Sequence, residues 1–144
     1  MCIRDSVNPT TLGGKATIKE VIFTFSHQDK ALEATLALFL PNEITGAVPV
    51  FLGYNFKGNH TIFSDESISL TSSWIPKNTN DGMTEDKASS LSRGIRSARW
   101  PVLNIINRGY GLATMYYGDI DPDFDDDFEN GVHALFPNLS LIHI

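Results

Sequence analysis

The chain has 144 residues, of which 42% are hydrophobic, and its formal net charge is −6. This acidic balance, with no clustered basic patch, argues against a nucleic-acid partner. No apolar run approaches the roughly 20 residues that a membrane-spanning helix needs, so we also expect no membrane span.

Both ends of the chain match the translated sequence of a sequencing adapter. Residues 1–6 are Met-Cys-Ile-Arg-Asp-Ser and residues 139–144 are Leu-Ser-Leu-Ile-His-Ile. The DNA string ATGTGTATAAGAGACAG encodes the first of these, and its reverse complement encodes the second. We therefore predict that both ends are adapter-derived artefacts and that residues 7–138 are the natural segment, cut at both ends. Cys2, the only cysteine, then lies outside it, and no thiol or disulfide chemistry is expected.

The N-terminal third predicts a loop followed by a hairpin. Residues 7–15 contain Pro and two Gly and are expected to form a loop. Residues 17–26 and 32–40 alternate apolar and polar side chains around a polar turn, which predicts an antiparallel hairpin. Residues 41–46 then form a connector.

The next segment, residues 48–60, is the centre of the sequence. Residues 48–54 form a nearly continuous apolar run, which is typical of a strand buried on both faces of a parallel sheet. The run ends in a loop rich in Gly and amide side chains. Such loops at the ends of strands are a common place for a ligand or an oxyanion in α/β proteins.

A second strand and a helix follow after a long polar stretch. Residues 61–99 carry no clear periodicity, although Trp74, Ile75 and Pro76 are expected to anchor them locally. Residues 101–108 predict a helix that begins at Pro101 and stops at Gly109. Residues 112–117 predict a second buried strand, parallel to the first because a helix lies in the crossover. We expect this second strand to be left as an unpaired edge, so that the segment folds poorly alone.

An acidic run follows the second strand. Its members are Asp119, Asp121, Asp123, Asp125, Asp126, Asp127 and Glu129. Neither register of the run places Gly at the sixth and Glu at the twelfth position of a calcium-binding EF-hand loop. A solvated acidic loop is the favoured interpretation, with one carboxylate orienting another group in a cleft as the alternative.

Other polar side chains show no complete catalytic or metal-binding pattern. His60 and His133 lack zinc-ligand spacing and are interpreted as hydrogen-bonded structural histidines. The serines at 64, 67 and 69 lie in no Gly-x-Ser-x-Gly elbow. The arginines at 93, 96 and 99 predict a solvated basic face, with a carboxylate clamp as the alternative.

Three stretches resemble the bacterial glucuronoyl esterases of carbohydrate esterase family 15. They are Val-Pro-Val-Phe-Leu-Gly-Tyr-Asn-Phe-Lys-Gly-Asn-His at 48–60, Ala-Arg-Trp-Pro at 98–101, and Arg-Gly-Tyr-Gly-Leu-Ala-Thr-Met-Tyr-Tyr-Gly-Asp-Ile-Asp-Pro-Asp at 108–123. Gly-Val-His at 131–133 continues the resemblance, and residues 61–96 contribute little to it.

The resemblance implies the N-terminal part of a serine esterase that cleaves 4-O-methyl-glucuronoyl esters between xylan and lignin. The fold class is then α/β: an incomplete α/β-hydrolase-like three-layer sandwich with an antiparallel N-terminal hairpin followed by a βαβ unit. The family's Gly-Cys-Ser-Arg-x-Gly motif, its acid and its catalytic histidine are absent here, so no catalytic residue is assigned and the segment is expected to be inactive.

The resemblance also implies where this segment would contribute to the site. The loop expected to line the catalytic serine consists of Asn55, Phe56, Lys57 and Gly58. Replacement of Gly58 by proline is expected to lower turnover at least tenfold without changing thermal stability. No cofactor or metal is expected, the implied partner is a glucuronoxylan–lignin ester, and the family suggests export.

Two alternatives stay open at this point. One is another α/β-hydrolase esterase or peptidase. The other is a non-catalytic carbohydrate-binding β domain that uses the acidic loop as a metal site. The helix expected between two buried strands favours the hydrolases.

Overall fold

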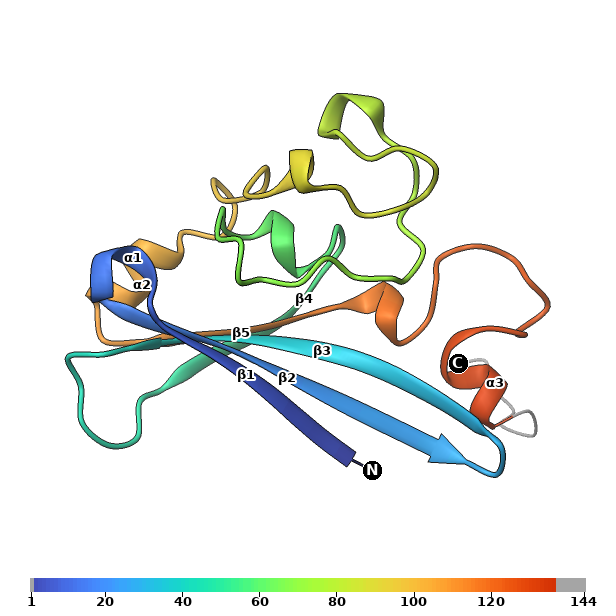
Figure 1. The fold of residues 1–144 in the computed structure, drawn as a ribbon, viewed down its shortest axis with the longest axis horizontal. Helices are drawn as coiled ribbons and strands as arrows, with labels where there is room; N and C mark the ends of the chain where they lie inside the picture. Colours follow the sequence, from blue (N-terminus) through green and yellow to red (C-terminus); the bar gives the residue numbers. More distant parts are fainter. Residues whose placement is uncertain (1, 137–144) are drawn as a thin grey trace, which may run out of the picture.

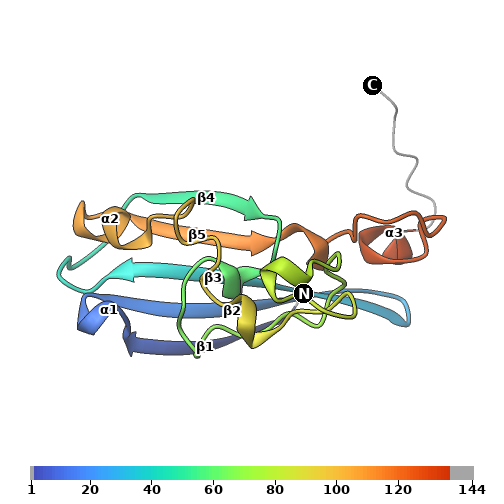
Figure 2. The same cartoon turned by 90° about the horizontal axis from the view of Figure 1, so that it is seen from above.

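A computed structural model describes residues 2–136, which form one mixed β-sheet with a long crossover packed on one face (Figure 1). The strand order is β1-β2-β3-β5-β4, as the view in Figure 2 shows. The strands are β1 (Cys2–Thr10), β2 (Ala16–His27), β3 (Lys30–Pro41), β4 (Val50–Asn55) and β5 (Gly111–Tyr116).

The predicted hairpin is confirmed as β2 and β3. The two strands pair antiparallel from Ala16↔Pro41 to His27↔Lys30, so the turn is tighter than the polar stretch suggested. Its alternation places Ile18 and Phe39 on the face that the crossover covers, where both are buried. A shift of one residue would turn these side chains to the opposite face, and burial therefore fixes the register.

The prediction of a loop over residues 7–15 is wrong. The chain pairs antiparallel with β2 from Cys2↔Thr24 to Asn8↔Ile18, and only then bends through α1 (Thr11–Gly14), one irregular turn. Pro9 signalled a loop, but an edge strand tolerates proline because its outer N–H groups have no partner to lose. This pairing uses backbone groups, which any sequence supplies, so it does not test whether residues 1–6 derive from an adapter, and that origin stays a prediction. Residues 139–144, the other predicted adapter segment, lie outside the described residues.

The βαβ unit is confirmed. β4 and β5 pair parallel from Val50↔Gly111 to Asn55↔Tyr116, and the crossover between them contains α2 (Val102–Asn107). Pro101 precedes the first helical residue instead of occupying it. Gly109 ends the helix in a left-handed conformation with φ +80°, as expected.

The burial expected for the two parallel strands holds for only one of them. β5 lies between β3 and β4 and is buried almost throughout. β4 lies at the edge of the sheet, and Phe51, Leu52 and Tyr54 are 55%, 77% and 59% exposed. The expectation that residues 112–117 form the unpaired edge is therefore wrong, because β5 is inserted between two earlier strands and β4 takes the edge.

The crossover is ordered despite its polar sequence. It contains three short 3₁₀ helices, η1 (Asn59–Thr61), η2 (Thr79–Asp81) and η3 (Ser90–Ser92). Ile62 and Ile68 enter the core beneath it, and Ile75 is fully buried with Met83, which confirms the local anchor expected there.

Three carboxylates hold the crossover to the rest of the fold. Glu20 of β2 accepts hydrogen bonds from the backbone N–H and the hydroxyl of Ser69. Asp65 accepts a 2.7 Å bond from the Thr11 hydroxyl, which links the crossover back to α1. Asp119, in η4 (Tyr117–Asp119) after β5, holds the stretch 71–73 and is described with the site.

The opposite face of the sheet is apolar and largely open. A hollow of about 480 Å³ lies on it, lined by Phe23, Leu36, Leu52, Gly53, Tyr54 and Met115. α3 (Gly131–Leu135) lies near one end of β3. Among residues 2–136 no helix has the length and apolar character to cross a membrane.

Candidate functional site

The candidate site lies where β4 and β5 end. The carboxyl ends of two parallel strands meet at the same edge of the sheet, so the loops after Asn55 and Tyr116 lie next to each other. The ring of Phe56 from the first loop packs against Tyr117 from the second, with centroids 5.1 Å apart. The sheet thus brings the predicted loop 55–58 against the start of the acidic run.

Asn55 fastens the base of the predicted loop. Its side-chain amide donates to Asn59 Oδ1 at 2.7 Å and to Thr114 Oγ1 of β5 at 3.1 Å. Asn59 in turn donates to the Thr35 carbonyl of β3 at 2.8 Å. Asn55 is 2% exposed, so its side chain fixes the loop through buried hydrogen bonds and is not accessible to solvent.

The middle of the loop points outward. Phe56 is 68% exposed, and Lys57 is partly exposed beside it. These two residues are therefore the members of the predicted set whose side chains are accessible.

Gly58 closes the loop in a conformation that only glycine adopts readily. Its φ is +92° and its ψ is 148°. A Cβ at this position would lie 2.7 Å from Cε1 of His60. Proline fixes φ near −65°, so the expectation that Gly58→Pro leaves thermal stability unchanged is wrong.

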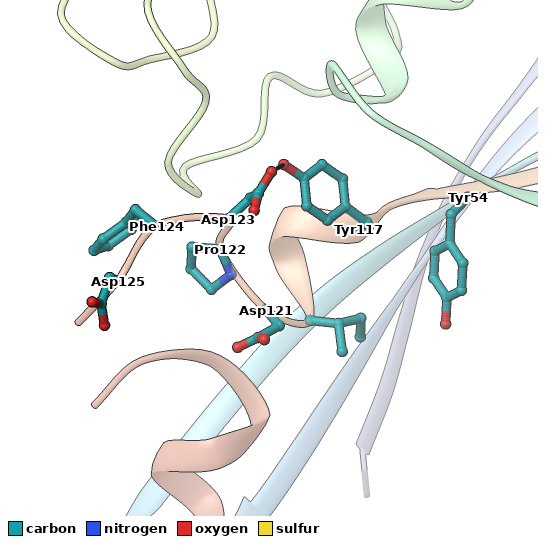
Figure 3. Close-up of a pocket in the computed structure, with 8 residues that line it drawn as sticks. Tyr54, Tyr117, Asp121, Pro122, Asp123, Phe124 and Asp125 are labelled. Carbon is teal, nitrogen blue, oxygen red and sulfur yellow. Dashed lines mark hydrogen bonds between the residues drawn. The ribbon is translucent and has the colours of Figure 1, made fainter. Parts of the chain in front are cut away.

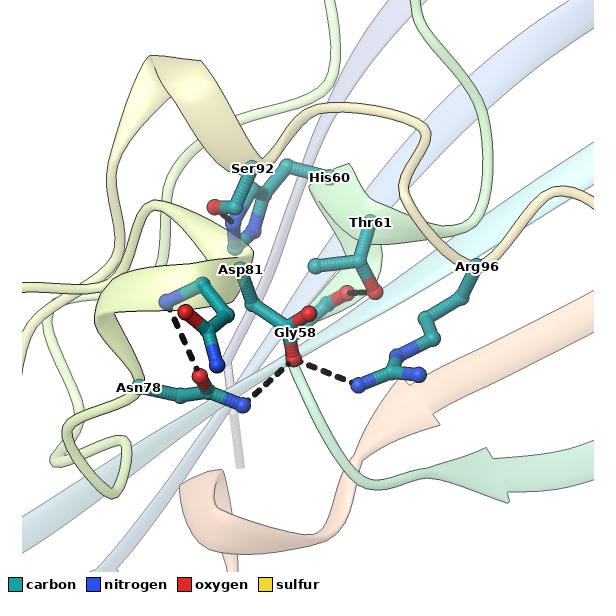
Figure 4. Close-up of polar contacts among 8 residues, drawn as sticks. Gly58, His60, Thr61, Asn78, Asp81, Ser92 and Arg96 are labelled. Carbon is teal, nitrogen blue, oxygen red and sulfur yellow. Dashed lines mark hydrogen bonds and ion pairs between the residues drawn. The ribbon is translucent and has the colours of Figure 1, made fainter.

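His60 is a buried structural histidine, as its sequence context indicated. Its Nε2 lies 2.8 Å from the Ser92 hydroxyl (Figure 4). That hydroxyl donates to the Ser89 carbonyl at 2.6 Å. With the Ser92 proton on that carbonyl, the geometry favours the tautomer in which His60 donates from Nε2 to the serine oxygen. Burial, and then the positive charge of Arg93, lower the pKa of His60 from 6.5 to about 4.

This pair could be mistaken for a catalytic dyad, because a serine and a histidine are in hydrogen-bond contact. Burial argues against that role: the Ser92 hydroxyl is inaccessible to a substrate carbonyl and donates to the Ser89 carbonyl. Both residues are fully buried. Ser92 was not singled out from the sequence, because nothing near it in the chain indicates that it meets His60.

The predicted basic face is wrong for two of its three arginines. Arg96 forms a 2.6 Å ion pair with Asp81, which also accepts from Asn78 (Figure 4). Arg93 donates to the carbonyls of Asp65 and Ile68. Both side chains therefore tie parts of the crossover together, and Arg99 alone is exposed.

Asp119 departs from the solvated acidic loop that the sequence favoured. It is 4% exposed and accepts from the Thr71 hydroxyl at 2.7 Å, the Ser73 hydroxyl at 2.8 Å and the Thr35 N–H at 3.2 Å. The alternative, that one carboxylate orients other groups, thus applies to this residue. The exposed members of the run are Asp121, Asp123, Asp125, Asp127 and Glu129.

A wide groove opens beside these loops. Its volume is about 700 Å³, and Figure 3 shows several of its lining residues. They are Tyr54, Tyr117, Ile120, Asp121, Pro122, Asp123, Phe124 and Asp125. Tyr117 donates to Asp123 over 3.4 Å, and burial followed by the charge of Asp123 raises the pKa of this phenol. The groove therefore combines aromatic rings with carboxylates at the end of two parallel strands.

The groove does not contain a recognisable metal centre. No group of three or more His, Cys, Asp or Glu side chains is arranged to hold a metal ion in the part of the chain that the structure describes. His133 lies 3.5 Å from Asp121 and packs edge-on against Phe128. The metal-binding alternative for the acidic loop thus receives no support from these positions.

Comparisons with known proteins find relatives among the carbohydrate esterases. A carbohydrate esterase from an unknown prokaryotic organism, MZ0003, is 45% identical over 132 residues, which are 92% of this chain and 30% of the relative. A promiscuous CE15 esterase from a marine bacterial metagenome is 41% identical and superposes with a TM-score of 0.74, over 95% of this chain and 35% of that one. The chain is related to the CE15 esterases.

A second solved structure agrees with this assignment. The glucuronoyl esterase from Solibacter usitatus is 36% identical and has a TM-score of 0.79, over 94% of this chain and 34% of that one. No protein-family profile matches the chain. The chain spans about a third of the length of these relatives. The relationship confirms the fold class, an incomplete α/β-hydrolase sheet, and excludes the pure β domain.

Proposed function

We propose that residues 7–138 belong to a serine carbohydrate esterase that hydrolyses 4-O-methyl-glucuronoyl esters between xylan and lignin. The observation that carries the proposal is the match to the Solibacter usitatus glucuronoyl esterase over 94% of this chain, with a TM-score of 0.79. The curated relative is matched over 132 residues, and the segment 7–138 is also 132 residues long.

In this proposal the nucleophile lies outside the chain. A serine would attack the uronate ester carbonyl, a histidine would take its proton and return it to the leaving alcohol, and an acid would orient the histidine. The Ser92–His60 pair cannot substitute for these residues, because the hydroxyl is buried and already donates to the Ser89 carbonyl. The chain by itself is therefore inactive.

The contribution of this chain is the loop of Asn55, Phe56, Lys57 and Gly58. Hydrolases of this fold place a backbone N–H from the loop after the corresponding strand next to the reacting carbonyl. The position at the carboxyl end of β4 and the buried anchors on either side of Phe56 and Lys57 support that role. A loop held at both ends can aim a backbone dipole without reorganising during the reaction.

A chimeric enzyme tests the proposal. Residues 7–138 would replace the matching third of the Solibacter usitatus esterase, and turnover of a benzyl glucuronoyl ester would be measured. We expect a folded chimera that hydrolyses the ester, whereas the isolated chain does not. A folded chimera with no hydrolysis, or hydrolysis by the isolated chain, would contradict the assignment.

The runner-up function is an esterase of the same fold with another substrate. The marine CE15 esterase is promiscuous, which favours testing this alternative directly. The chimera would be assayed with acetyl and aryl esters beside the benzyl glucuronoyl ester. Higher kcat/KM on the neutral esters than on the uronate would favour the broader activity.

A further inference from the structure

The side chain of Asn55 has a fixed orientation, which a backbone carbonyl determines. The Thr35 carbonyl can only accept a hydrogen bond, so Asn59 presents its Nδ2 to that oxygen, at 2.8 Å, and its Oδ1 to Asn55. Asn55 must then direct its own Nδ2 at Asn59, and the same amide group reaches Thr114 Oγ1 at 3.1 Å. A flipped Asn55 would set its Oδ1 against Asn59 Oδ1, with no proton between the two acceptors. The hydrogen bonds thus allow a single orientation of this side chain.

Thr35, where this series of hydrogen bonds begins, lies at the point where the sheet opens. The pairing of β3 with β5 ends at Leu36↔Met115, so Thr35 lies just beyond the last pair. Its carbonyl accepts from Asn59, and its N–H donates to Asp119 Oδ2 at 3.2 Å. Two side chains thus satisfy the backbone groups that a paired strand would otherwise satisfy. The end of β4 and the 3₁₀ helix η4 are thereby tied to the same residue of β3.

The other end of the loop 55–58 is fixed as well. The Gly58 carbonyl accepts from the Thr61 N–H at 3.0 Å and from the Thr61 hydroxyl at 2.8 Å. Asn55, Thr61 and Thr114 are 2% exposed or less, so water does not compete for these hydrogen bonds, and the low local dielectric strengthens them. The backbone of residues 56–57 is therefore held between two buried anchors.

We infer that Thr114 is a positioning residue for the ester hydrolysis: through Asn55, its hydroxyl fixes the direction in which the loop 55–58 presents its backbone N–H groups. The inference rests on the proposed function and assigns a role to a side chain of β5 that is fully buried and therefore out of reach of a substrate. A backbone donor stabilises the transition state only if it already points at the developing oxyanion. An error of about 1 Å in its placement can lower the rate by about a hundredfold.

A role in packing and a role in positioning predict different outcomes for substitutions of Thr114. Packing uses the shape of threonine, which valine reproduces, whereas positioning uses its hydroxyl, which serine keeps. Thr114→Val leaves one N–H of Asn55 without its acceptor, so one of the two bonds that orient this amide is lost. Thr114→Ser keeps the acceptor and removes only a methyl group. Thr114→Ala also lacks the hydroxyl and takes the place of Thr114→Val should valine prevent folding.

The variants would be compared in the chimeric enzyme described above, with folding verified by circular dichroism. Thr11→Val is the matched control. The Thr11 hydroxyl is also buried and also holds part of the crossover, through a 2.7 Å bond to Asp65, but it lies in α1, outside the candidate site. Two measurements would be made: kcat and KM for the benzyl glucuronoyl ester, and hydrogen exchange of the backbone amides of residues 56–58, which does not require activity.

We expect Thr114→Val to lower kcat by about tenfold or more, with KM within about twofold of the parent chimera, because the lost interaction matters only in the transition state. The loop amides of this variant should also exchange faster, whereas Thr114→Ser and Thr11→Val should resemble the parent chimera in both measurements. A parent-like kcat in Thr114→Val, an equal loss in Thr11→Val, or unchanged exchange would overturn the inference. A parent chimera that folds but hydrolyses no ester would refute the proposed function, and the exchange rates alone would then decide whether Thr114 holds the loop.

Discussion

Gly58 lies in a backbone region that is almost exclusive to glycine, and its absent side chain leaves room for the His60 ring. We predict that Gly58→Ala destabilises the chimera by about 2 to 4 kcal/mol, because strain and a clash with His60 add together. Gly46→Ala is the control: φ is +100° there, but no atom lies within 4 Å of the added Cβ. Thermal melts should show a larger loss of stability for Gly58→Ala than for Gly46→Ala. Equal losses would show that the clash with His60 does not contribute.

The neutral His60 makes stability depend on pH. Its pKa is about 4 in the folded protein and 6.5 in the unfolded chain, so the unfolded chain binds the proton more readily. The stability of the folded state is therefore complete above pH 6.5 and declines as the pH falls toward 4. A shift of this size corresponds to about 3 kcal/mol at most.

His60→Gln tests this pH dependence, because glutamine does not titrate. Urea unfolding of the chimera at pH 7, 5.5 and 4.5 should show a steeper decline for the parent than for the variant. Asp65 contributes in a different window: its pKa is lowered below 3.8, so its stabilisation is lost only under more acidic conditions. Identical slopes in the two proteins between pH 6.5 and 4.5 would contradict the prediction.

At the scale of elements, the crossover depends on Asp119. Three donors from β3 and from the stretch 71–73 converge on this buried carboxylate. Asp119→Asn turns an amide donor toward some of these groups, and we expect a loss of about 2 to 3 kcal/mol. Asp125→Asn, at an exposed position of the same loop, should change stability by less than about 0.5 kcal/mol. Equal effects in denaturant melts would show that the hydrogen bonds of Asp119 contribute little.

The sequence predicted the elements whose signals are local. Alternation over 17–26 and 32–40 was sufficient for the hairpin, and Gly109 marked the end of α2. It did not predict β1, because pairing with β2 outweighs the loop signals of Pro9. The apolar run at 48–54 correctly indicated a strand, but exposure depends on which strands lie beside it, and this is not encoded in the run itself.

The candidate site was likewise predictable only in part. Composition indicated a Gly- and amide-rich loop after the strand, the resemblance to the CE15 esterases assigned residues 55–58 to the site, and that role stays a prediction. The partners of Asn55, His60 and Asp119 were not predictable, because each meets residues far away in the chain. A lone serine at 92 or threonine at 114 carries no signal until the sheet brings it to its partner.

At the scale of the whole molecule, the open β4 edge should limit the behaviour of the isolated chain. We predict that residues 7–138 expressed alone aggregate or show no cooperative thermal transition. The cause is β4 with its exposed apolar flanks, since β5 is paired on both sides. Sedimentation velocity and calorimetry would measure this. A monomer with one sharp transition would mean that the described sheet is a self-sufficient domain.

The place of β5 between β3 and β4 also determines the order in which the sheet can assemble. β2 and β3 pair across a short turn, whereas Leu36 of β3 meets Met115 of β5 from 79 residues away. Val50 of β4 likewise pairs with Gly111 of β5, which leaves the ribosome 61 residues later. Long-range closures of this kind slow folding and leave apolar strands exposed in the meantime. During synthesis, β4 is thus a strand without any partner until β5 arrives, and chaperone binding should concentrate on it in that interval.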